Sequence, residues 1–168
     1  MSAAHLILLL VAAQRLAEVV YAGRNTRALL REGWTEVGAG HYPLMVFLHG
    51  GWLLSMALWV PPDATIHWSP LIAFVLLQVA RIWVIATLGR YWTTRIVTSP
   101  GAPLVRHGPY RFLRHPNYAI VVGEIALLPL VFGAWELALV FSALNLALLR
   151  YRLRMENEAL RPRYRLYE

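Results

Sequence analysis

The stretch Leu104–Tyr118, LVRHGPYRFLRHPNY, holds the densest group of cationic, imidazole and phenol side chains in an otherwise apolar chain. Helix packing requires no such cluster, so we expect the chemistry of the protein to lie here. Pro116 also predicts the start of a helix, because the N–H that proline lacks has no partner at the first helical position. The free backbone N–H groups of Asn117 and Tyr118 could then hold a carboxylate or phosphate.

The composition around this stretch indicates an integral membrane protein. Of the 168 residues, 58% are hydrophobic and 15% charged, with a mean hydropathy of +0.49. Such values are too apolar for a soluble domain, and they predict one all-α membrane domain over residues 1–168. The absence of cysteine excludes disulfides, thiolate metal sites and cysteine nucleophiles. The histidines are not at metal-ligand spacing, so we expect no metal site.

Five apolar runs predict five transmembrane helices, since a bilayer crossing takes about 20 residues. The last two runs are short and only Gly133-Ala134 and their neighbours separate them, which predicts a tight antiparallel hairpin. Residues 23–41 are expected to form a short amphipathic piece and a flexible turn, and the polar tail 150–168 to continue the fifth helix at least to Pro162. The predicted spans are residues 3–22, 42–60, 70–88, 116–132 and 135–149.

The arginines predict the orientation of these spans. All 16 basic residues are arginine, and the segments after the first, third and fifth spans contain three, five and six of them. The segments after the second and fourth spans contain none, and the last two arginines lie within spans. Under the positive-inside rule the N-terminus is outside and the C-terminus is cytoplasmic. The net charge of +7 therefore needs no nucleic-acid partner, and segment 89–115 should meet the tail at the cytoplasmic face of the cell membrane.

Several polar residues allow two interpretations each. Arg15 and Glu18 share one helical face and could form an internal ion pair or line a polar cavity. Glu124 in the fourth span could pair with Arg15 or Arg81, or serve as the base for a substrate hydroxyl. In the tail, Arg152 and Glu156 are four residues apart, which fits either a surface ion pair or part of a site.

A family resemblance begins at the third span. Gly108-Pro109-Tyr110-Arg111, Arg114-His115-Pro116-Asn117-Tyr118 and the downstream Arg152–Leu160 resemble the isoprenylcysteine carboxyl methyltransferase family, together with Arg81, Leu88-Gly89 and Trp92. More locally, residues 93–96, 101–118 and 123–135 resemble a bacterial branch that includes O-methyltransferases of alkylpyrones and alkylresorcinols.

The resemblance implies a membrane-embedded O-methyltransferase that uses S-adenosylmethionine at the cytoplasmic face. In the family, the arginine matching Arg152 directs the acceptor and the glutamate matching Glu156 holds the amino group of the cofactor. Other matching residues line the cofactor site: Ala102, Pro103, Leu104, Val105, Tyr110, His115, Pro116, Asn117 and Tyr118. The family often has paired glutamates where this chain has Glu156 and Asn157, so one carboxylate is missing or displaced to Glu158.

The expected acceptor is a lipid-like molecule that enters from the bilayer and presents a carboxylate, enol or phenol oxygen. An acidic acceptor needs no strong base, and Glu124 would assist only an acceptor that arrives protonated. Two other classes remain open: a sterol-reductase-like membrane enzyme using NADPH, and a non-enzymatic transporter or partner protein. A reductase is expected to have Gly-Asp soon after the motif tyrosine, where this chain has Ala119-Ile120.

Overall fold

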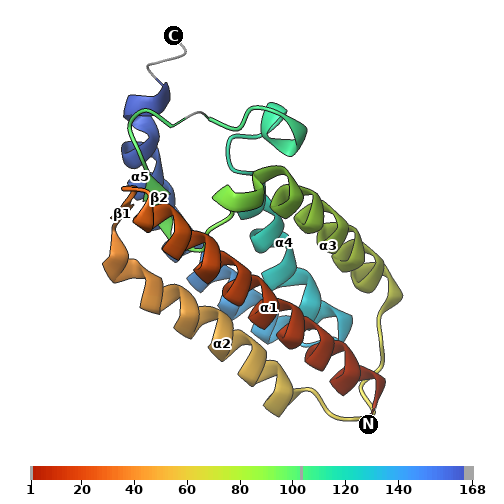
Figure 1. Cartoon of the computed structure of the whole chain (residues 1–168). Coiled ribbons are helices and arrows are strands. Elements are labelled where there is room, and N and C mark those ends of the chain that lie inside the picture. Colours follow the sequence, from red (N-terminus) through yellow and green to blue (C-terminus); the bar gives the residue numbers. More distant parts are fainter. Residues whose placement is uncertain (1, 103, 165–168) are drawn as a thin grey trace.

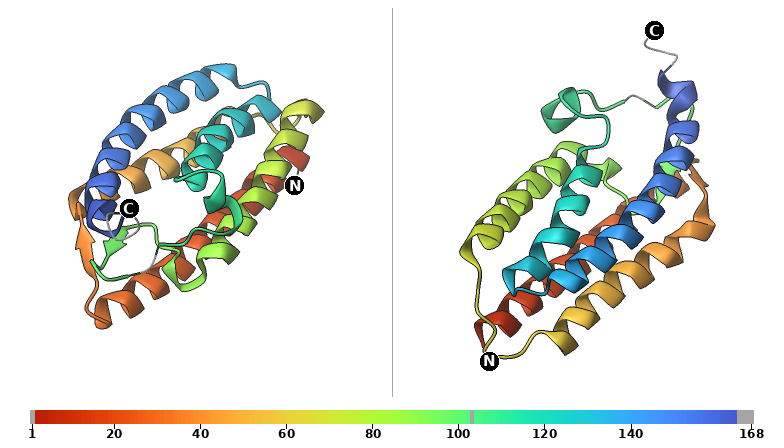
Figure 2. Two further views of the ribbon diagram at one scale, coloured as in Figure 1. Left: turned by 90° about the horizontal axis from the view of Figure 1, so that it is seen from above. Right: turned by 180° about the vertical axis from the view of Figure 1, so that it is seen from behind.

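The computed structural model describes residues 2–102 and 104–164, and 76% of the structure is helical. The helices pack as a closed group in which α3 contacts α4, α4 contacts α5, α5 contacts α2 and α2 contacts α1 (Figures 1 and 2). Apolar side chains fill the space between them, among them Trp52, Met56, Ile125 and Leu128. The five long helices are α1 (Ala3–Arg31), α2 (Tyr42–Trp59), α3 (Trp68–Leu88), α4 (Pro116–Val131) and α5 (Trp135–Tyr164).

The hairpin of the last two helices is confirmed. Gly133 adopts φ +70°, a left-handed conformation that glycine accepts without strain, and it ends α4 directly before α5 begins. The tail continues α5 without interruption, so this helix of 30 residues is about 45 Å long. Helix α5 therefore extends from one end of the molecule, at Trp135, to the other end, where Arg152 and Glu156 lie.

Helix α1 is longer than the first predicted span. It continues through the predicted surface segment to Arg31, because residues 23–31 contain no proline and Gly23 is tolerated inside the helix. Gly33, with φ +85°, ends it, and the N–H of Trp34 donates to the carbonyl of Leu29 at 3.1 Å. The prediction of a short amphipathic piece and a flexible turn was therefore wrong for this segment.

The all-α prediction was also wrong at one place, where two short strands pair. Strand β1 (Thr35–Val37) lies antiparallel to β2 (Ile96–Thr98), with Glu36 opposite Val97. Their β-branched residues favour extended backbone, and Arg95 of the β2 side binds Glu36 at 3.0 Å. This pairing ties the polar segment after α1 to the polar segment after α3.

Short 3-10 turns complete the connections. These are η1 (Ala39–His41), η2 (Gly89–Tyr91) and η3 (Gly108–Arg111). Asn25 of α1 donates to the carbonyls of Gly89 and Trp92 at 3.0 and 2.9 Å, which fixes η2 against α1. These contacts hold the polar connections together at one end of the helix group.

Several helices have the length and composition of membrane spans, as in a multi-pass membrane protein. Among the described residues, Ala3–Arg31, Tyr42–Trp59 and Trp68–Tyr91 are long and apolar enough to cross a bilayer, and α4 is a shorter apolar helix. The 16 residues of α4 extend about 24 Å, less than the hydrocarbon core of about 30 Å. The count of five spans and their orientation stay predictions.

Three of the exposed tryptophans lie at the end of the molecule away from the polar connections. Trp59 ends α2, Trp68 begins α3 and Trp135 begins α5, and all three are exposed. The N–H of His67 donates to the carbonyl of Val131 at 2.8 Å, so the α2–α3 and α4–α5 connections meet at this end. Tryptophan is enriched at membrane–water interfaces, which makes this end one candidate boundary of the bilayer.

Candidate functional site

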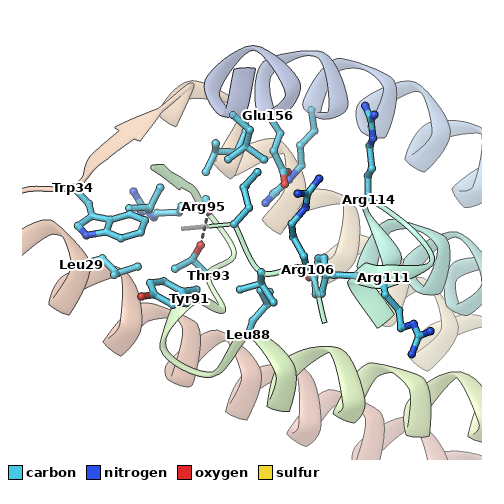
Figure 3. A pocket seen from close by; sticks show the side chains of 17 residues that line it. Leu29, Trp34, Leu88, Tyr91, Thr93, Arg95, Arg106, Arg111, Arg114 and Glu156 are labelled. Atoms are coloured by element: carbon cyan, nitrogen blue, oxygen red, sulfur yellow. Dashed lines mark hydrogen bonds between the residues drawn. The ribbon is translucent and has the colours of Figure 1, made fainter. Parts of the chain in front are cut away.

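A cavity of about 440 Å³ lies among the polar connections, at the end of the helix group away from Trp59, Trp68 and Trp135. Figure 3 shows the side chains that line this cavity. The C-terminal ends of α1 and α3, strand β2, segment 104–114 and the extension of α5 all contribute to it. Its lining residues are Leu29, Trp34, Leu88, Tyr91, Thr93, Arg95, Ile96, Val97, Leu104, Val105, Arg106, Tyr110, Arg111, Arg114, Arg152, Glu156 and Leu160. The opening stretch of the sequence and the tail of α5 therefore meet around one cavity.

A smaller recess of about 70 Å³ shares Leu88, Thr93, Tyr110, Arg152 and Glu156 with this cavity. Its other lining residues are Trp92, His115, Asn117 and Tyr118. The recess thus extends the cavity toward the first turn of α4.

A chain of hydrogen bonds joins α5 to α4 in the recess. The Nε of Arg152 donates to the hydroxyl of Tyr118 at 2.8 Å, and that hydroxyl donates to the carboxylate of Glu156. Arg152 and Glu156 are one turn apart on α5, and the α4–α5 hairpin brings Tyr118 against both. Arg152 is only 7% exposed, so the alternative of a surface ion pair is wrong.

His115 adds a second contact to Glu156. Its Nδ1 lies 3.5 Å from Glu156 Oε1, and its Nε2 lies 2.9 Å from Asn157 Oδ1. Both partners accept hydrogen bonds, and only an imidazolium donates from both ring nitrogens. Burial lowers the pKa of His115, but the Glu156 carboxylate outweighs it and the net pKa is raised. Asn157 thus contacts His115.

The charge of Glu156 is stabilised by the same contacts. Burial raises the pKa of this carboxyl, but the hydrogen bonds from His115 and Tyr118 and the charge of Arg152 lower it more, so its pKa falls below the ordinary value. Burial, with the charge of Glu156, raises the pKa of Tyr110. At neutral pH the site therefore presents a carboxylate beside a neutral phenol.

The first turn of α4 differs in one respect from its prediction. The helix begins at Pro116 as predicted, but the N–H of Tyr118 donates to the carbonyl of His115 at 3.1 Å and is not free. The expected use of the Tyr118 amide for an anion was therefore wrong. Among the described residues, the buried Oδ1 of Asn117 has no hydrogen-bond partner.

The other predicted cofactor residues fall into three groups. Leu104, Val105 and Tyr110 line the larger cavity. Ala102 and Pro116 are buried and line neither cavity. Pro103 lies outside the described residues.

Glu124 belongs to an ion network between α1, α3 and α4. Its carboxylate lies 2.7 Å from Arg15 and 3.0 Å from Arg81, and it accepts from Gln78 at 2.8 Å. Glu18 completes the network at 2.8 Å from Arg15 and 2.7 Å from Arg81. Glu124 is 3% exposed and lines neither cavity. Its position favours the ion-pair interpretation over the base.

Sequence reasoning missed the contribution of the N-terminal region to the cavity. Leu29 and Trp34 line it, and the rings of Trp34 and Tyr91 lie 5.6 Å apart at an angle of 33°. No local motif marks these residues, because Leu29 reaches the cavity from the end of α1 and Trp34 from the position directly before β1, which pairs with the distant β2. Within residues 2–102 and 104–164, no group of three His, Cys, Asp or Glu is placed to hold a metal ion.

Comparison with known proteins supports the resemblance. The model of the isoprenylcysteine carboxyl methyltransferase (ICMT) family matches residues 70–162, which include most of α3, all of α4 and both Arg152 and Glu156. The chain is also 36% identical over 159 residues to the uncharacterized protein YpbQ of Bacillus subtilis (strain 168), an alignment that covers 92% of this chain and 95% of that protein. No solved structure matches.

Proposed function

Because the chain belongs to the ICMT family, which implies a membrane methyltransferase, we propose that it transfers a methyl group from S-adenosylmethionine to an oxygen of a lipid-like acceptor. The observation that carries this proposal is the convergence of Arg152, Tyr118 and Glu156 beside the cavity. ICMT-family methyltransferases generally use this cofactor.

The residues of the cavity fit the cofactor. Its volume of about 440 Å³ lies within the range of about 300–1,000 Å³ for small-molecule sites. Glu156 would hold the ammonium group and aromatic rings such as Tyr110 would contact the adenosine or the sulfonium. Asn117 Oδ1, buried without a partner among the described residues, offers one more acceptor. The bound cofactor supplies a methyl group already activated as a sulfonium.

The task of the protein residues is then to align the acceptor and exclude water. The Arg152 guanidinium borders both the cavity and the recess, where it would attract and aim an anionic oxygen. A carboxylate or an acidic enol or phenol reacts as its anion and needs no base. We therefore assign Glu124 to the ion network rather than to proton removal.

The proposal includes the arrangement in the membrane. One domain of five spans would place the N-terminus outside, the C-terminus in the cytoplasm and the cavity at the cytoplasmic face of the cell membrane, as in a bacterial inner membrane. The arginines around the cavity support this orientation. The cofactor would reach the cavity from the cytoplasm, and the acceptor from the bilayer.

The test is calorimetric binding of S-adenosylhomocysteine to the full chain in detergent, with reduced nicotinamide dinucleotide as the comparison ligand, followed by transfer of radiolabelled methyl groups to lipid extracts. Binding of the first ligand alone is expected. Arg152→Lys should keep that affinity within about fivefold but lower methyl transfer about 100-fold, because an ammonium cannot replace the planar guanidinium that orients the acceptor. A parent protein that binds only the nicotinamide compound would refute the assignment.

Cofactor binding should release a proton from His115 at a pH between the ordinary and the raised pKa of this residue. In the free protein the pKa of His115 is raised by Glu156, and an ammonium that takes over this carboxylate would lower it again. Because the pKa of His115 is higher in the free protein than in the complex, protonation of His115 favours the free protein. The affinity for the cofactor should therefore rise with pH between the ordinary and the raised pKa of His115. Calorimetry in two buffers of different ionisation enthalpy measures the released proton. The release should be absent in His115→Asn, and proton uptake by the parent would contradict this linkage.

A further inference from the structure

The turn Arg111–Arg114, Arg-Phe-Leu-Arg, has apolar side chains exposed outside the helices. Phe112 is 69% exposed and Leu113 is 52% exposed, and both flanking arginines are exposed too. The opposite side of the same segment is anchored, because Pro109 is buried and Tyr110 packs against an apolar cluster that contains Val84 and Trp92. We call residues 111–114 the RFLR turn.

The turn has a defined conformation and a defined place. The N–H groups of Phe112 and Leu113 donate to the carbonyl of Pro109 at 3.1 and 3.2 Å. Gly108 has φ +58° and lies so close to Thr87 that an added Cβ would be 2.7 Å from the threonine hydroxyl. The RFLR turn is therefore fixed against the last turn of α3.

This place is where the second boundary of the bilayer would fall if α3 crosses it. The 21 residues of α3 from Trp68 to Leu88 extend about 31 Å, close to the hydrocarbon thickness of about 30 Å. Trp68 lies at the same end as Trp59 and Trp135, so in such a bilayer Thr87 and the RFLR turn would lie at the level of the opposite headgroups. Figure 1 shows this segment beyond the end of α3, outside the group of long helices.

The composition of the turn matches that level. Aromatic and aliphatic side chains gain by entering the interfacial region, and arginines near the surface are attracted by anionic lipids. The guanidinium of Arg111 lies 4.9 Å from the centre of the Phe112 ring, so the cation and the apolar group are presented together. Exposure of Phe112 and Leu113 to water is unfavourable because both side chains are apolar. In the interfacial region of a leaflet, the two apolar side chains and the two arginines would all have favourable surroundings.

We propose that the RFLR turn is an interfacial contact in which Phe112 and Leu113 enter the headgroup region of the adjacent leaflet, while Arg111 and Arg114 bind the phosphates of anionic phospholipids. The two arginines also line the 440 Å³ cavity. Anionic lipid would therefore reduce the positive charge at the wall of the cavity.

The test uses the full chain in nanodiscs of phosphatidylcholine, with or without phosphatidylglycerol. The natural sequence has no cysteine, so Leu113→Cys carries a single environment-sensitive fluorophore. Phe47→Cys, on an exposed position of α2, gives the membrane reference, and Glu158→Cys, on the α5 extension, gives the aqueous reference. The label at position 113 should be quenched at least twofold more by headgroup nitroxide lipids than by an aqueous quencher. Emission and quenching like those of position 158 in both membranes would overturn the proposal.

The arginine contact is tested in the same nanodiscs. Phosphatidylglycerol should increase the quenching of the position-113 label by headgroup nitroxide lipids, and this increase should be lost in Arg111→Gln/Arg114→Gln. If phosphatidylglycerol does not change the quenching of the label in the protein that keeps Arg111 and Arg114, the assignment of anionic lipid as the partner of these arginines is wrong. These readouts need neither a cofactor nor an acceptor.

The coupling to the cavity rests on the proposed function. S-adenosylmethionine carries one more positive charge than S-adenosylhomocysteine, so phosphatidylglycerol should raise the affinity for the first about threefold relative to the second. Equal changes for both ligands would overturn the coupling, while the fluorescence results would still decide the lipid contact.

Discussion

Glu156→Ala is expected to lower the affinity for S-adenosylhomocysteine by about 100-fold or more. The carboxylate would lose its bond to the ligand ammonium, and loss of one partner of a buried charged pair costs about 2–5 kcal/mol, while each factor of ten corresponds to about 1.4 kcal/mol. The effect should be large because Glu156 is the only carboxylate among the residues lining the two described cavities. Calorimetry on the solubilised protein measures it.

Two variants separate this loss from damage to the fold. Glu158→Ala removes an exposed carboxylate two residues away that lines neither cavity, and it should leave the affinity unchanged. Glu156→Gln keeps an acceptor for Tyr118 but has no charge, so its affinity should lie between those of the parent and of Glu156→Ala. Parent-like affinity of a folded Glu156→Ala would show that this carboxylate does not hold the cofactor.

Glu124→Ala is expected to destabilise the protein by about 3–5 kcal/mol. The carboxylate faces Arg15 at 2.7 Å and Arg81 at 3.0 Å, and removal of one member of a buried ion network leaves uncompensated charge. Thermal unfolding in detergent should show a fall in Tm on the order of 10 °C. Glu136→Ala, at an exposed position of α5, is the matched control and should unfold with the parent.

A second substitution tests whether the effect comes from the arginines. In Arg15→Ala/Glu124→Ala one of the uncompensated cations is removed, so the double variant should lose less stability than the sum of the two single variants. Additive losses, or a Tm of Glu124→Ala equal to that of the parent, would contradict the ion-pair role and restore the base as the better interpretation.

The parts of the fold with local signals could be predicted from the sequence. Proline at position 116 set the start of α4, and the short Gly133-Ala134 connection set the hairpin that brings Tyr118 to Arg152 and Glu156. Leu104, Val105 and Tyr110, which the family resemblance assigns to the cofactor site, line the cavity, while their role toward a cofactor stays a prediction. Each of these depends on residues close in sequence or on motifs of the family.

What could not be predicted depends on contacts between distant segments. Glu36 meets Arg95 only after the chain has formed α2 and α3, so a three-residue strand such as Thr35–Val37 gives too little signal by itself. The same pairing carries Trp34 to Tyr91 at the cavity. The choice between the two roles of Glu124 likewise required the positions of Arg15 and Arg81, since its own neighbours in sequence are all apolar or glycine.

The shortness of α4 has a consequence for the membrane itself. In the proposed arrangement of five spans, α4, at about 24 Å, would be shorter than the hydrocarbon layer of about 30 Å, a hydrophobic mismatch that a bilayer relieves by local thinning. Because α4 begins beside Arg152, thinning would draw the lipid headgroups toward the mouth of the site. A protein of this shape should partition toward thinner bilayers, and its turnover should fall as acyl chains lengthen even when every residue of the cavity is unchanged.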